Sequence, residues 1–171
     1  MLADAAKAAV LLFFVVVLQL AIMANVEIVG GHPNLLLVAI VSVALLRGAI
    51  FGAVAGFCAG LLADTGVFGT LGFTALLLTL AGYWAGRYVE TTGRDRVHAP
   101  MLSIAVMTLL YQIAALVLRF MLGEHAPGDQ ILAGLIPTVV LNLILTVPMY
   151  AFTRRLLRPH EWIGREVRLL G

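Results

Sequence analysis

The chain has 171 residues, of which 62% are hydrophobic and only 12% are charged. A soluble domain has about 45–50% apolar and about 25% charged residues, so this composition excludes a water-soluble globular protein and indicates a single-domain membrane protein. The net charge of +2 is small, and the placement of the charges is more informative than their sum.

Six apolar segments follow one another and predict six transmembrane helices, because about 20 helical residues cross a bilayer core. The first segment ends at Asn25-Val26-Glu27, which offers no small-residue cleavage site, so we interpret it as a retained helix and not as a secretory signal. Pro33 is well placed to open the second helix. The predicted helices are 8–26, 34–46, 49–63, 71–86, 101–122 and 135–152, within a transmembrane domain 1–153.

The second and third segments are short and are separated only by Arg47-Gly48. They are little tilted, extended by their flanks, or shielded inside the bundle. The charge distribution favours two helices over one interrupted helix, because fusion would move everything after it, including the five arginines of the tail, to the opposite side of the membrane from Lys7. With six helices, ten of the eleven basic residues face the cytoplasm together with both termini. We therefore expect a multi-pass membrane protein with both termini in the cytoplasm.

The carboxy-terminal tail 154–171 is too polar to cross a membrane but alternates arginines with apolar residues. Such a segment is expected to lie on the inner leaflet and bind anionic lipid, although a basic end that only sets the topology is the alternative. The residues predicted to contact the membrane surface are Arg154, Arg155, Arg158, Trp162, Arg165 and Arg168.

Glycines recur every fourth residue in the third helix, at Gly48, Gly52, Gly56 and Gly60, and therefore share one face. Gly82 and Gly86 offer a similar face on the fourth helix. In lipid, small residues let helices approach closely. The pattern predicts either helix packing within the bundle or a groove for a partner's transmembrane helix.

Asp64 follows this face directly. Its carboxylate is expected to accept hydrogen bonds from the opening turn of the fourth helix and to hold the loop in place. A catalytic or ion-binding site would need a second acid or a histidine at matched spacing, and the nearby sequence contains neither.

Three amides, Gln19, Gln112 and Asn142, have the same calculated depth near the middle of the membrane. Polar side chains at this depth are expected to face the bundle and bond one another, as a locking layer or as the lining of a ligand pocket. Pro137 and Pro148 interrupt the sixth helix near Asn142.

No residue pattern typical of catalysis or cofactor binding is present. The four histidines lie in loops or the tail without metal-ligand spacing, and there is no phosphate-binding loop. The single cysteine, Cys58, is expected to be a small core residue. We predict no enzyme activity, no cofactor, no metal and no nucleic-acid partner.

The segment from Leu45 to Arg87 resembles the MreD family of bacterial rod shape-determining membrane proteins. The resemblance rests on Arg47-Gly48, the glycines of both helices, Asp64 and Gly86-Arg87, with Asn142 and Pro148-Met149-Tyr150 later in the chain. The family-motif polar residues are Arg47, Asp64, Arg87 and Asn142.

The resemblance implies a non-enzymatic scaffold of the cell-elongation complex. Its implied partners are a single-span MreC-like protein, MreB, RodA and a penicillin-binding transpeptidase, and whether the chain is a monomer or a homodimer stays open. It also implies a fold similar to the substrate-binding S-components of energy-coupling-factor (ECF) transporters. An S-component that captures a vitamin is the alternative function, although the short outer loops here offer few hydrogen-bonding side chains for a solute.

Overall fold

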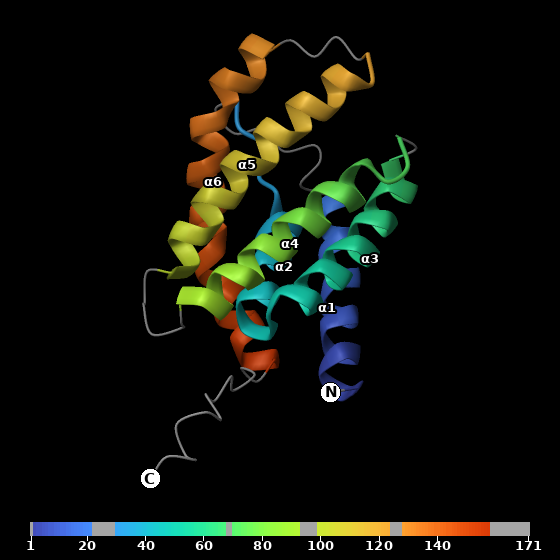
Figure 1. The fold of residues 1–171 in the computed structure, drawn as a ribbon, viewed down its shortest axis with the longest axis vertical. Coiled ribbons are helices and arrows are strands. Elements are labelled where there is room, and N and C mark those ends of the chain that lie inside the picture. The colour runs from blue at the N-terminus through green and yellow to red at the C-terminus, as the bar shows by residue number, and fades with distance from the viewer. Residues whose placement is uncertain (1, 22–29, 68–69, 93–98, 124–127, 158–171) are drawn as a thin grey trace.

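The computed structural model describes residues 2–21, 30–67, 70–92, 99–123 and 128–157. Successive helices run in opposite directions, so the start of α1, the α2–α3 turn and the end of α6 lie at the same end of the bundle (lower part of Figure 1). The prediction of an all-helical protein is confirmed over these residues. The helices are α1 (Leu2–Ala21), α2 (Leu35–Arg47), α3 (Ala49–Val67), α4 (Phe73–Thr92), α5 (Ala99–Met121) and α6 (Gly128–Leu156).

Helix α2 is the core of the bundle. Every residue from Leu35 to Leu46 is buried, and the helix contacts each of the other five. A helix that is apolar on all sides requires such an enclosed position. The sequence left three explanations for the shortness of this segment, namely little tilt, extension by its flanks or shielding inside the bundle. The structure supports shielding inside the bundle.

Four helices are long and apolar enough to cross a membrane by length and composition. They contain the spans Asp4–Ala21, Ala49–Gly66, Pro100–Met121 and Gly134–Leu156. Large apolar side chains such as Phe14, Ile50, Phe120 and Ile136 are exposed on the surface, as expected for contact with lipid. Because α2 has 13 residues and α4 is not among these spans, six full crossings stay a prediction.

Several helices extend beyond the ranges expected from the apolar runs. Helix α3 continues past Asp64 to Val67, and α4 continues past Gly86 to Thr92. Helix α6 begins at Gly128 and includes Arg154 and Arg155, which were expected in the tail. Apolar composition marks the part of a helix in hydrocarbon, whereas the backbone hydrogen bonds continue until the chain turns.

Gly48 makes the sharp turn between α2 and α3. Its φ of +95° lies in the region that only glycine adopts readily. Beside it, the Arg47 guanidinium pairs with the Asp4 carboxylate of α1 at 2.7 Å and lies 5.6 Å from the centre of the Phe51 ring. The turn is thereby joined to the first turn of α1.

Candidate functional site

The glycines of α3 and α4 face each other and bring the two helices into backbone contact. A Cβ atom added at Gly56 would meet the carbonyl oxygen of Leu78, and one added at Gly60 would meet the backbone of Ala75. At Gly52 it would lie 2.6 Å from the carbonyl oxygen of Gly82. Contact this close is the reason that small residues are needed along the whole face.

This contact leaves no room for another helix on the same face. Gly52, Gly56 and Gly60 are buried against α4, and a Cβ at Gly86 would collide with the α3 start at Ala49. The geometry therefore assigns these glycines to packing within the chain. A partner helix would have to bind a different surface.

Asp64 ties the end of α3 to the start of α4. Its carboxylate is buried, and it accepts hydrogen bonds from the backbone N–H groups of Gly72 at 2.9 Å, Thr74 at 3.1 Å and Ala75 at 3.2 Å. These are N–H groups that have no partner inside α4. The hydrogen bonds expected for Asp64 from the sequence are present, and they use the carboxylate in a structural role.

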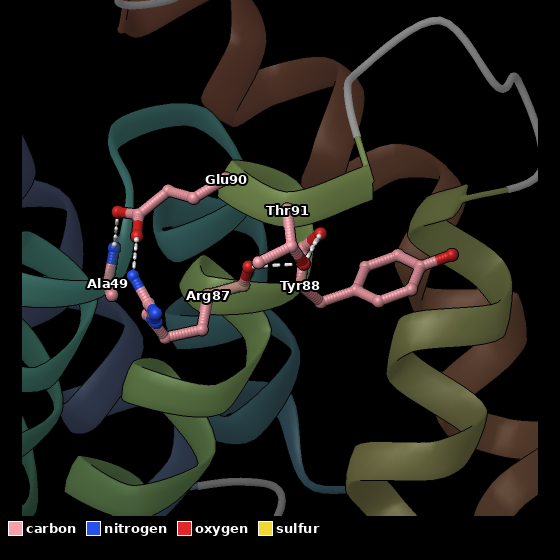
Figure 2. Close-up of polar contacts among 5 residues, drawn as sticks. All are labelled: Ala49, Arg87, Tyr88, Glu90 and Thr91. Atoms are coloured by element: carbon pink, nitrogen blue, oxygen red, sulfur yellow. Dashed lines mark hydrogen bonds and ion pairs between the residues drawn. The ribbon is translucent and has the colours of Figure 1, made fainter.

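Glu90 performs the same task at the other end of the hairpin. Its Oε1 accepts the backbone N–H of Ala49, the first residue of α3, at 2.8 Å. Its Oε2 lies 3.2 Å from Nη1 of Arg87 (Figure 2). Tyr88 points away from this carboxylate, and the Thr91 hydroxyl donates to the backbone carbonyls of Arg87 and Tyr88, so Glu90 itself makes one cap and one ion pair. The guanidinium is about half exposed, and such a pair contributes little by itself.

A set of hydrogen bonds that we call the polar centre surrounds the start of α2. The Gln19 side chain accepts the N–H of Leu35 at 2.8 Å and donates to the carbonyl of Pro33 at 3.3 Å. Asn142 of α6 accepts the N–H of Asn34 at 2.8 Å and donates to the Thr108 hydroxyl at 3.1 Å.

Two further side chains belong to the polar centre. Asn34 caps its own helix by accepting the N–H of Leu37 at 2.9 Å, and Thr138 accepts the N–H of His32 at 3.1 Å. The backbone N–H groups of Asn34, Leu35 and Leu37 at the start of α2 thus bond side chains of α6, of α1 and of the capping residue itself. This matters because no water is available in hydrocarbon to replace a missing partner.

The predicted amide layer is therefore only partly correct. Gln19 and Asn142 do face the interior, but they bond the backbone at the start of α2 and not one another. Gln112 does not join them. Its partly exposed side chain makes no hydrogen bond within the described residues.

The predicted membrane-surface residues fall into two groups. Arg154 and Arg155 are exposed on the last turn of α6, at the same end of the bundle as the start of α1. Arg158, Trp162, Arg165 and Arg168 lie outside the described residues.

The prediction for Cys58 was wrong. Its side chain is exposed on α3, because Gly56 and Gly60 and not Cys58 face the neighbouring helix. Within the described residues no group of three histidine, cysteine, aspartate or glutamate side chains could hold a metal ion.

A comparison with protein families decides the identity. The family model of rod shape-determining protein MreD matches residues 6–160. The chain belongs to the MreD family. No curated protein and no solved structure matches it. The MreD match includes Asp64, Glu90 and the polar centre, and it identifies a multi-pass membrane protein that takes part in rod shape determination.

Two functional positions were not identified from the sequence. The sequence patterns assigned no role to Glu90 or to Asp4. Glu90 lies one helical turn after Gly86, which packs on Ala49. If the two glycine faces are aligned in antiparallel register, Glu90 falls beside the start of α3. This alignment is the signal in the sequence that could have identified its role.

Proposed function

We propose that this chain is a non-enzymatic scaffold of the bacterial cell-elongation complex. It binds a single-span MreC-like protein and helps to position lateral peptidoglycan synthesis with RodA, a penicillin-binding transpeptidase and MreB. It lies in the cytoplasmic membrane with both termini inside, held at the inner leaflet by its basic tail. The match of residues 6–160 to the MreD family is the observation that carries this proposal.

The polar centre supports a scaffold over a solute-binding subunit. A vitamin-binding S-component would need free hydrogen-bonding groups in its interior, since a ligand site requires convergent polar groups. Here both polar atoms of the Gln19 side chain and both of the Asn142 side chain are used by the chain itself. The start of α2 occupies the place where a solute would bind to these groups.

The charge distribution supports the proposed orientation. Arg47, Arg154 and Arg155 lie in the last turns of α2 and α6, at the same end of the bundle as the N-terminus (Figure 1), and Arg87 lies in the half of α4 that leads to this end. Among the described residues, the basic side chain near the opposite end of the bundle is that of Arg119, in the last turn of α5. This asymmetry is the one that the positive-inside rule predicts for cytoplasmic termini.

Co-purification tests the proposal. The tagged chain is co-expressed with the MreC-like protein of the same organism, purified in mild detergent, and analysed by mass spectrometry before and after denaturation. We expect the MreC-like protein in roughly stoichiometric amount and no released small molecule. A stoichiometric vitamin-like compound without the protein partner would contradict the scaffold function and support the S-component.

A further inference from the structure

Gln112 has an unused amide near the middle of a membrane-spanning helix. It lies within the span Pro100–Met121 of α5. Its side chain is partly exposed, and the adjacent Leu109 and Ile113 are exposed apolar residues. The amide is therefore at the edge of a surface that faces lipid.

An amide without a hydrogen bond is unfavourable in hydrocarbon. The other two amides at comparable depth show how this chain avoids that situation, because Gln19 and Asn142 each use both their oxygen and their nitrogen. Gln112 departs from this pattern. Polar side chains on a membrane helix commonly bond a neighbouring helix, so the missing partner is expected to come from outside this chain.

Arg119 lies on the same face of α5, two turns further from the cytoplasmic end. Seven residues separate it from Gln112, which corresponds to about 10 Å along the helix. Its guanidinium lies 5.7 Å from the centre of the Phe73 ring of α4, and no carboxylate of the described residues is within ion-pair distance. The stacking on Phe73 holds this positive charge at the edge between α4 and α5.

We infer that the α4–α5 edge marked by Gln112 and Arg119 is a docking line for a transmembrane helix of another protein. That helix carries a hydrogen-bonding side chain near mid-membrane and an aspartate or glutamate about two turns nearer the outer surface. The inference rests on the proposed scaffold function and names the surface that performs it. The glycine face of α3 is unavailable for this purpose, because α4 covers it.

Charge favours a different protein over a second copy of this chain at the same edge. Two copies related by a two-fold axis along the membrane normal would bring their Arg119 side chains together at the outer end. Like charges placed opposite each other disfavour association. An acidic residue on a different helix would instead complement the guanidinium.

The test compares Gln112→Leu and Arg119→Gln with wild type, using the MreC-like protein co-expressed with the tagged chain. We expect each variant to retain about 3- to 18-fold less partner, the range that corresponds to one interhelical side-chain hydrogen bond. Gln112→Leu should also keep the melting temperature of the purified chain alone, because Gln112 makes no hydrogen bond in the part of the bundle that the structure describes. Arg119→Lys should retain more partner than Arg119→Gln, and Val106→Ala, on another exposed face of α5, should behave as wild type.

Three results would overturn the inference. Wild-type levels of partner on both variants would show that the helix binds elsewhere, while the scaffold function would stand. A loss of stability in Gln112→Leu would show an internal role for the amide. The third result comes from a photo-crosslinking residue placed at Leu116, four positions after Gln112. It should capture the co-expressed partner, and capture of a second copy of this chain would refute the assignment. If wild type itself retained no partner, the scaffold function would fail first.

Discussion

Asp64 and Glu90 cap each other's helices at opposite ends of the α3–α4 hairpin. Asp64 belongs to α3 and accepts N–H groups from the first turn of α4, whereas Glu90 belongs to α4 and accepts the first N–H group of α3. Between them, the glycine faces bring the two backbones together. The hairpin is therefore stabilised at both ends and along its length by contacts between α3 and α4 themselves.

Removal of the Asp64 carboxylate should destabilise the protein. Asp64→Ala leaves the N–H groups of Gly72, Thr74 and Ala75 without their acceptor, and we expect the free energy of unfolding to fall by about 2 kcal/mol. Thermal unfolding in detergent measures the effect. Asp64→Asn keeps one acceptor oxygen and should lose less, and Thr65→Ala at the exposed neighbour should change little. An unchanged stability of Asp64→Ala would contradict the cap.

The two caps should act independently. Glu90→Ala is expected to cost about 1 kcal/mol, and because the caps are at opposite ends of the hairpin, the double variant with Asp64→Ala should add within about 0.5 kcal/mol. Denaturant titrations of both single variants and the double variant give the comparison. Arg87→Ala should have a much smaller effect than Glu90→Ala, since its ion pair is exposed. A coupling above about 1 kcal/mol would mean that the loss of one cap changes the contribution of the other through the helix contact between them, and would contradict their independence.

A methyl group at the glycine contact should not be tolerated. Gly56→Ala places a Cβ atom against the backbone of Leu78, which cannot move without separating the helices. We expect a loss of about 1–3 kcal/mol and reduced accumulation in membranes. Gly66→Ala is the matched control, because its Cβ would meet only the end of the flexible Leu20 side chain. Equal accumulation of the two variants, measured by immunoblot, would argue against the close helix contact.

The three amides should divide into two classes. Gln19→Leu and Asn142→Leu remove acceptors of the N–H groups at the start of α2 and should each lower the free energy of unfolding by about 1–3 kcal/mol. Gln112→Leu should leave it unchanged. Melting curves of the three purified variants, recorded without any partner, provide the measurement. Three equal losses would restore the amide layer that the sequence suggested.

How much of this could be predicted depends on the range of the interaction. The glycine spacing and the position of Asp64 are local, and they were sufficient to predict a cap and a close helix contact, but not whether the glycines contact a helix of this chain or of a partner. The roles of Gln19 and Asn142 depend on the backbone at Asn34 and Leu35, which lies far from Asn142 in the sequence. A shared depth indicated that these amides were buried, but it could not separate them from Gln112, because depth does not specify which way a side chain faces.

The start of α2 has a consequence for how the chain is made. Helix α2 is synthesised second, yet Asn142 and Thr138, which satisfy the N–H groups of Asn34 and His32, belong to the last helix. A nascent chain that ends before α6 therefore holds α2 in the membrane with open backbone donors, and it can complete this turn only after nearly the whole sequence has been translated. Correct folding of the start of α2 therefore depends on the last helix of the chain. A chain truncated before α6 should be recognised as incompletely folded and degraded in the cell.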